Sequence, residues 1–338
     1  MIMYNDFFGL RKDPFQLTPD PEFLYLTEQH REALAGLTYA ILARKGFVVL
    51  TGDAGTGKTT LLTRILEHLP VSRLQSSVIV NPTLTPAEFL EAVLLDFGLT
   101  DIPASKAQRI GILQSFLWRG HREGKIAALI VDEAHKLSPE VLEEIRLLGN
   151  FESANEKLLQ IVLVGQSELD SLLNRENLRQ FKQRISIRLA IAPLSGEEIE
   201  PYIRYRWMKA GGRDAPFSAS AMVGIGQASQ GIPRLVNVLC DNALMLACGE
   251  GSGSVELRHV VAVCRELQFD QPLPKFDQPL PIGEAVAAAP TPAPAVAAFP
   301  VEAPAMKTQE LPGSVAARPS LLARFASKLR FMQRIEPA

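Results

Sequence analysis

One stretch of this 338-residue chain constrains its fold more than any other, the glycine-rich segment Gly52-Asp53-Ala54-Gly55-Thr56-Gly57-Lys58-Thr59-Thr60. The apolar run 47–50 precedes it, and a helical pattern over 61–66 follows it. Between a strand and a helix, G-x-x-x-x-G-K-[ST] is typical of a phosphate-binding loop. Glycines let the backbone curl so that its N–H groups point at an anion, and the next helix adds partial positive charge. A glycine-rich turn that matches by chance is the alternative, which the flanks disfavour. The whole segment is therefore predicted to bind a nucleotide.

The side chains of this loop predict the chemistry of the site. Lys58 would reach the β- and γ-phosphates of a nucleoside triphosphate, and the Thr59 hydroxyl would bind Mg²⁺. A second apolar run, 126–131, ends in the acidic pair Asp132 and Glu133. In phosphate-loop proteins such an aspartate holds Mg²⁺, and the adjacent acid polarises the attacking water. The sequence thus predicts an ATPase with ATP and Mg²⁺ as cofactors, and Thr59 and Asp132 as metal ligands.

The residues Asp132-Glu133-Ala134-His135 also match the motif of one helicase class. We reject that interpretation because such helicases need two similar α/β domains in one chain, and only one is predicted here. His135 is therefore predicted to be a loop residue that follows the acids.

Apolar runs and helical patterns alternate along the first part of the chain. Further strands are predicted at 77–80, 126–131, 159–164 and 186–192, and helices at 28–44, 86 onward, 106–123, 138–148 and 175–184. Such alternation indicates an α/β fold with a parallel sheet and helices on both faces. After Pro193 the pattern is purely helical. We therefore predict a nucleotide-binding domain over 1–193, whose proline-rich first 30 residues are an extension packed across a domain, and a helical domain over 194–267.

Two segments beyond residue 267 differ from the rest in composition. Residues 268–317 hold the hexapeptide Phe-Asp-Gln-Pro-Leu-Pro twice and a stretch of almost only Ala, Pro and Val, which predicts a disordered linker. Residues 318–338 regain a helical pattern, with apolar residues on one face and most of the basic ones opposite. A basic amphipathic helix over 318–335 can rest on an anionic membrane or bind a partner protein. A solvated tail is the alternative.

Charge and cysteine content narrow the class of protein. Residues 318–338 carry five basic residues against one acidic residue, so this tail is +4 and the other 317 residues contribute −6 to the total of −2. An acidic body argues against a large nucleic-acid-binding face. Cys240, Cys248 and Cys264 lack metal-ligand spacing, and few unpatterned cysteines fit a reducing compartment. The sequence shows neither a signal peptide nor an apolar run of the roughly 20 residues that cross a bilayer. A cytoplasmic location is predicted, with peripheral contact at the inner face of the membrane through the tail.

Several ordered motifs span residues 1–267, namely Phe7-Phe8-Gly9-Leu10, Pro14-Phe15, Thr18-Pro19-Asp20-Pro21, Phe23-Leu24-Tyr25, Asp132-Glu133-Ala134-His135-Lys136-Leu137, Val162-Leu163-Val164-Gly165-Gln166 and Gly231-Ile232-Pro233-Arg234-Leu235-Val236-Asn237. Together they resemble the ExeA/GspA-type AAA+ ATPases. The resemblance implies a P-loop NTPase of the AAA+ class, with a five-stranded parallel sheet, a small helical lid and ATP between them. It also implies an ATP-dependent homo-oligomer, with a hexamer as one candidate size, whose ATP lies between subunits.

The resemblance also assigns roles to single residues. Gln166 takes the sensor-1 place beside the γ-phosphate. Arg234, which opens a lid helix, takes the sensor-2 place and contacts the nucleotide; an ordinary helix-start arginine is the alternative. Arg184 takes the place of an arginine finger that reaches a neighbour's ATP, and such a finger stabilises transition-state charge. Arg188 is the second candidate for that role, and a surface ion pair is the alternative for either. The segment around Tyr25 is expected to line the adenine pocket.

The sequence departs from the longer members of this family. Members that act in type II secretion carry a transmembrane helix and a peptidoglycan-binding domain after the ATPase part, and here only the linker and tail follow it. The first hypothesis is therefore an Mg²⁺-dependent ATPase that drives or regulates assembly of a secretion or envelope system, such as an exopolysaccharide or pilus system, with partner proteins. An ATP-dependent DNA-binding regulator of transposition is the alternative. A slow nucleotide switch that controls oligomerisation is the third hypothesis.

Overall fold

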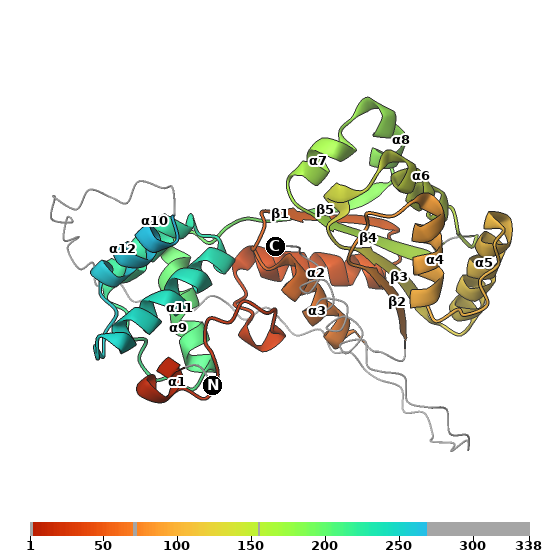
Figure 1. Cartoon of the computed structure of the whole chain (residues 1–338). Coiled ribbons are helices and arrows are strands. Elements are labelled where there is room, and N and C mark those ends of the chain that lie inside the picture. The colour runs from red at the N-terminus through yellow and green to blue at the C-terminus, as the bar shows by residue number, and fades with distance from the viewer. Residues whose placement is uncertain (1–2, 70–72, 155, 269–338) are drawn as a thin grey trace, which may run out of the picture. The chain divides into compact units, whose positions relative to one another are not determined.

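The computed structural model describes residues 3–69, 73–154 and 156–268 (Figure 1). The predicted basic tail lies outside these residues, and so does the predicted linker beyond Gln268. Within the described part, none of the helices combines the length and the apolar character needed to cross a lipid bilayer.

A five-stranded sheet forms the centre of the nucleotide-binding part. Its strands are β1 (Phe47–Gly52), β2 (Leu74–Ile79), β3 (Ile126–Val131), β4 (Leu159–Gly165) and β5 (Ile185–Ile191), in the order β2-β3-β4-β1-β5. Every neighbouring pair is parallel, with Val48 beside Val162 and Val131 beside Leu163. The predicted five-stranded parallel sheet is confirmed. Because all strands run the same way, the residues that follow β1, β3 and β4 meet at one edge, which is where open α/β sheets bind ligands.

Helices cover both faces of this sheet (Figure 1). On one face, α2 (Glu28–Leu42) and α3 (Lys58–His68) pack Leu37 and Leu61 against Leu50 of β1. On the other, α4 (Pro86–Asp96), α5 (Lys106–Arg122) and α6 (Pro139–Leu148) pack Phe89 and Ile145 around the alternate side chains of the same strands. The central strands β1, β3 and β4 are buried on both faces, which is why their sequences are mostly apolar, whereas β5 alternates between partly buried and exposed residues.

Local sequence signals define where several helices begin. At α4, the Thr85 hydroxyl accepts the N–H of Glu88, the Glu88 carboxylate accepts the N–H of Thr85, and Pro86 occupies the first turn. The helix expected over 175–184 is absent as one element, which corrects that prediction. The chain forms α7 (Glu168–Leu173), η3 (Glu176–Leu178) and α8 (Arg179–Lys182) instead. These short pieces bury Leu178 and Phe181, with the Phe181 ring 5.1 Å from that of Phe47.

The helical part contains α9 (Gly196–Lys209), α10 (Ala219–Ser229), α11 (Pro233–Gly249) and α12 (Leu257–Glu266), which pack around one cluster of buried side chains (Figure 1). The predicted small helical lid is confirmed as a fold element. The N-terminal extension, with α1 (Met3–Phe8) and η1 (Pro21–Phe23), adds Tyr4, Phe15 and Phe23 to this cluster. Buried Arg206 of α9 donates to the carbonyl of Pro14 at 2.6 Å. The extension therefore packs with the lid helices, because its aromatic residues find apolar partners there.

Candidate functional site

The predicted phosphate loop connects β1 to α3 at the carboxyl edge of the sheet. Gly57 caps α3 with φ 95°, and Gly55 has φ 82°, backbone angles that glycine adopts without steric cost. A Cβ atom at Gly55 would lie 2.7 Å from the Cβ of Arg234, and the Arg234 N–H donates to the Gly55 carbonyl at 3.2 Å. The loop thus curls as predicted, and the first turn of α11 rests directly on it.

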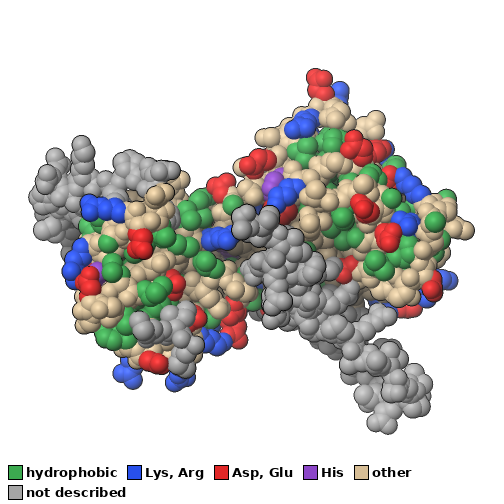
Figure 2. Space-filling view, in the orientation of Figure 1, with side chains coloured by type: hydrophobic (Ala, Val, Ile, Leu, Met, Phe, Trp, Pro, Cys, Tyr) green, Lys and Arg blue, Asp and Glu red, His purple; other side chains and the backbone are tan. Residues whose placement is uncertain are grey.

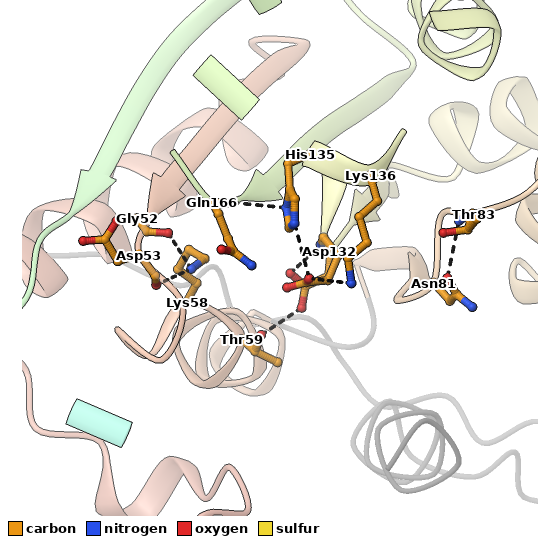
Figure 3. Close-up of polar contacts among 11 residues, drawn as sticks. Gly52, Asp53, Lys58, Thr59, Asn81, Thr83, Asp132, His135, Lys136 and Gln166 are labelled. Carbon is orange, nitrogen blue, oxygen red and sulfur yellow. Dashed lines mark hydrogen bonds and ion pairs between the residues drawn. The ribbon is translucent and has the colours of Figure 1, made fainter. Parts of the chain in front are cut away.

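Lys58 points back into the mouth of this loop. Its Nζ donates to the carbonyls of Gly52 and Asp53, at 2.7 Å each, and the residue is only 6% exposed. Burial lowers the pKa of Lys58, whereas the nearby carboxylates of Asp132 and Glu133 act to raise it. The two carbonyls hold the Lys58 amino group at the position where a phosphate-binding loop needs positive charge (Figure 3).

Thr59 and Asp132 lie together although 73 residues separate them in the chain. The Thr59 hydroxyl donates to Asp132 Oδ2 at 2.8 Å (Figure 3). Asp132 Oδ1 accepts the backbone N–H of Glu133 at 2.9 Å. Asp132 is 4% exposed; burial raises its pKa, and these two hydrogen bonds oppose the shift. Hydroxyl and carboxylate oxygens are the ligands that Mg²⁺ prefers, so the pair fits a magnesium ion. Among the described residues no cluster of three or more His, Cys, Asp or Glu could form a metal cage. Mg²⁺ usually needs no such cluster, because substrate phosphates and water complete its coordination shell.

Glu133 begins the short helix η2 (Ala134–Lys136) in a left-handed backbone conformation, φ 54° and ψ 33°. For a residue other than glycine this conformation costs roughly 1–3 kcal/mol, and such strain concentrates at functional sites. Glu133 Oε2 lies 3.1 Å from Lys136 Nζ and 3.7 Å from His135 Nε2. His135 Nδ1 also accepts the backbone N–H of Gln166 at 3.3 Å (Figure 3). His135 thus touches two predicted site residues, a role that no sequence signal indicated.

A cavity of about 420 Å³ joins most of the predicted site residues, namely Tyr25, Ala54, Gly55, Thr56, Gly57, Lys58, Thr59, Thr60, Glu133, Gln166 and Arg234. Gly52, Asp53 and Asp132 lie directly behind its wall through the hydrogen bonds described above. Tyr25 packs its ring 6.0 Å from Tyr202 and 5.6 Å from Tyr205, which are both on α9. The cavity therefore lies between the phosphate loop, the N-terminal extension and the lid helices.

The two candidate arginine fingers lie away from this cavity. Arg184 precedes β5, and its Nη1 donates to the carbonyl of Arg146 at 2.9 Å and to Asn150 Oδ1 at 2.6 Å. The next residue, Ile185, is paired with Phe47 at the amino end of β1, so Arg184 lies at the edge of the sheet opposite to the phosphate loop. Arg188 forms an exposed ion pair with Asp170 at 2.7 Å. Any role of either arginine at an ATP site would have to be played in another subunit.

His30 is a second residue that sequence reasoning missed. It is 3% exposed and supports the phosphate loop from behind, because its Nε2 lies 3.1 Å from the carbonyl oxygen of Thr56. A carbonyl can only accept, so Nε2 carries the proton and Nδ1 accepts from the Thr27 hydroxyl at 2.7 Å. The Thr27 hydroxyl in turn accepts the N–H of His30 at 3.2 Å. Burial lowers the pKa of His30. The threonine three residues before the histidine was the readable signal, since it marks a helix start.

Comparison with known proteins agrees with this fold and this arrangement of site residues. Residues 41–173 match the family model described as AAA domain. The ORC2 protein of Aeropyrum pernix shares the fold with a TM-score of 0.59 at 19% identity, over 76% of this chain and 73% of that one. The RuvB branch migration motor of Thermotoga maritima shares it with a TM-score of 0.50 at 21% identity, over 75% and 74%. Residues 41–173 therefore match an AAA domain, and this stretch contains the phosphate loop, the acidic pair and Gln166.

Two known proteins are similar to this chain in sequence. General secretion pathway protein A of Aeromonas hydrophila is 41% identical over 254 residues, which are 75% of this chain and 46% of the relative. The ATP-dependent target DNA activator B of Escherichia phage Mu is 27% identical over 261 residues, which are 75% of this chain and 76% of that protein. The predicted resemblance to the ExeA/GspA-type AAA ATPases is thereby confirmed. The chain spans less than half the length of the secretion relative.

Proposed function

We propose that this protein binds ATP with Mg²⁺ and hydrolyses it, and that the hydrolysis cycle drives or regulates assembly of a secretion or envelope system. The observation that carries the first part is the 2.8 Å hydrogen bond between Thr59 and Asp132, which unites the loop with the acidic pair. The similarity to General secretion pathway protein A supports the second part.

The residues of the cavity divide the chemical work between them. The loop N–H groups and Lys58 would bind the β- and γ-phosphates, and Thr59 with Asp132 would hold the metal, which neutralises charge on those phosphates. Glu133 would polarise the attacking water, and Gln166 would contact the γ-phosphate. Phosphoryl transfer needs little covalent chemistry from a protein, so positioned charges and donors carry most of the rate enhancement.

The remaining proposed roles concern the lid helices, the adenine pocket, a neighbouring subunit and assembly partners. Arg234 rests on the phosphate loop and would report the state of the nucleotide to the lid helices, and the region of Tyr25 would receive the adenine. We propose that Arg184 completes the site of a neighbouring subunit in a homo-oligomer. We also propose a cytoplasmic location, contact with assembly partners, and peripheral membrane contact through residues 318–335.

A DNA-binding regulator is the second candidate function. Its support is the phage Mu relative, an ATP-dependent target DNA activator, which this chain matches over 76% of that protein's length. Basic and acidic side chains are interspersed on the face of the molecule in Figure 2, whereas a large duplex-binding surface is expected to be broadly basic. The acidic body of the chain, residues 1–317 with a net charge of −6, favours the secretion hypothesis.

Steady-state phosphate release by the full chain tests both functions. Wild type should hydrolyse ATP only with Mg²⁺, and Lys58→Ala should lose tight ATP binding in a titration. Lys182→Ala is the matched control, because Lys182 is an exposed lysine of α8 outside the cavity. Retained ATP affinity in Lys58→Ala would remove Lys58 from the site. Strong stimulation by duplex DNA with a steep salt dependence would favour the second function instead. ATP-dependent oligomers without detectable turnover would indicate a nucleotide switch.

A further inference from the structure

The imidazole ring of His135 lies between Gln166, which the proposed function places beside the γ-phosphate, and Glu133, which it assigns to the attacking water. Its Nδ1 accepts the backbone N–H of Gln166 at 3.3 Å (Figure 3). Its Nε2 lies 3.7 Å from Glu133 Oε2. The side chain is 12% exposed, so its surroundings restrict how the ring can turn. One rigid ring thus touches the end of β4 on one side and the predicted water-polarising acid on the other.

The hydrogen-bond donors and acceptors determine where the ring carries its proton. A backbone N–H can only donate, so Nδ1 must present its lone pair to Gln166. In the neutral ring the proton then lies on Nε2, which faces the Glu133 carboxylate. At 3.7 Å this second contact is electrostatic rather than a direct hydrogen bond. The neutral ring therefore presents its lone pair to the Gln166 amide and its N–H toward the Glu133 carboxylate.

The backbone around His135 leaves little room for independent movement. Strands β3 and β4 are neighbours, with Val131 paired to Leu163, so the residues after each strand lie side by side. Ala134, the residue before His135, is completely buried. A Cβ atom at Gly165 would lie 3.2 Å from the backbone nitrogen of His135, which shows how closely the two segments approach.

We propose that His135 is a positioning residue that couples Gln166 to Glu133, so that contact between Gln166 and the γ-phosphate sets the orientation of the water-polarising acid. This inference rests on the proposed function. Lys136 contacts the same carboxylate at 3.1 Å but has no hydrogen bond to Gln166 among the contacts described, and it therefore serves as the natural control.

Three substitutions separate the two contacts of the ring. His135→Asn places a carbonyl oxygen near the position of Nδ1, so it keeps an acceptor for Gln166 and loses the group that faces Glu133. His135→Gln places an amide near the position of Nε2 and loses the acceptor for Gln166. His135→Ala loses both. His121→Ala controls for loss of a histidine, because His121 lies near the end of α5, outside the cavity.

If His135 couples the two segments, both contacts are needed. We expect His135→Asn, His135→Gln and His135→Ala each to lower kcat for ATP by roughly 10- to 100-fold, the range seen when an orienting partner is lost. The Kd for ADP and the Tm should stay within about twofold and a few degrees of wild type, as in His121→Ala. Wild-type kcat in either single-contact variant overturns the coupling. A joint loss of kcat, ADP affinity and Tm shows a merely structural role and also overturns it.

Hydrogen exchange of the Gln166 amide in the full chain gives a readout that needs no turnover. The amide should be protected in wild type and His135→Asn, and should exchange faster in His135→Gln and His135→Ala. Glu133→Ala should also accelerate its exchange, because the ring loses the carboxylate that orients it, whereas Lys136→Ala should not. Equal exchange in Glu133→Ala and wild type overturns the coupling. Absence of ATP turnover in a wild type that shows the expected exchange pattern contradicts the proposed function and leaves the His135 link standing.

Discussion

The Thr59 hydroxyl donates a 2.8 Å hydrogen bond to the carboxylate of Asp132, although the two residues belong to α3 and to the end of β3. The pairing depends on the sheet, because β1 and β3 lie on either side of β4 and their carboxyl ends open on the same edge. The bond brings a metal-binding hydroxyl and a metal-binding carboxylate within reach of one ion.

Removing either partner should therefore weaken nucleotide binding only when magnesium is present. We expect Thr59→Ala and Asp132→Asn to lower the affinity for Mg²⁺–ADP by about tenfold or more, because a ligand is lost from the metal. The affinity for ADP in excess EDTA should change little. Isothermal titration with and without Mg²⁺ measures the difference, and Thr38→Ala, on α2 and outside the cavity, is the control. Equal losses with and without the metal would contradict the assignment.

Glu133→Gln should bind ATP but hydrolyse it very slowly. The amide keeps the size of the side chain and cannot take a proton from water, and general-base catalysis contributes about 10²–10⁴-fold to rates. Single-turnover hydrolysis together with an ATP titration separates the two effects. Glu143→Gln is the control, because Glu143 is an exposed residue of α6 that pairs with Arg146. Near-normal turnover in Glu133→Gln would deprive Glu133 of its proposed role.

The buried histidine behind the phosphate loop should make stability depend on pH. Burial lowers the pKa of His30 from its ordinary value of 6.5, so the unfolded chain binds the proton more readily than the folded one. The contribution of His30 to stability is therefore complete above pH 6.5 and is lost as the pH falls through its folded pKa. Urea unfolding at pH 7.5 and 5.5 should show a smaller pH difference for His30→Gln than for wild type. An unchanged pH difference would show that His30 does not titrate in this way.

Mixing two inactive variants tests whether a catalytic site spans two chains. Lys58→Ala removes the phosphate site of its own subunit, and Arg184→Ala removes the proposed finger for a neighbour's site. In a mixed oligomer some sites combine an intact Lys58 with an intact Arg184, so ATPase activity should exceed that of either variant alone. The same mixture with Arg188→Ala in place of Arg184→Ala distinguishes the two candidates. No gain in either mixture would place both arginines outside the catalytic site.

Several features of the site could be predicted because the residues that form them are contiguous. The loop Gly52–Thr60 contains its own turn residues, its lysine and its metal ligand, and the acidic pair directly follows a strand whose continuous apolar run marks it as central. The alternation of strands and helices was equally readable, and the observed parallel sheet agrees with it. The prediction of one helix over 175–184 was wrong. The segment forms η3 and α8 instead, and these short helices bury Leu178 and Phe181.

What the sequence alone determined is the chemistry carried by local pattern: a curled backbone, a charged side chain within it, and a carboxylate at the end of a buried strand. Tertiary structure alone decided which distant groups support that chemistry, since His30 reaches Thr56 and His135 reaches Gln166 only through the packing of α2 on β1 and of η2 on β4. It also decided that the aromatic N-terminal extension packs with the lid helices. Local structure follows from backbone sterics and residue spacing. These long-range contacts depend instead on which apolar faces of helices and strands pack together in the folded chain.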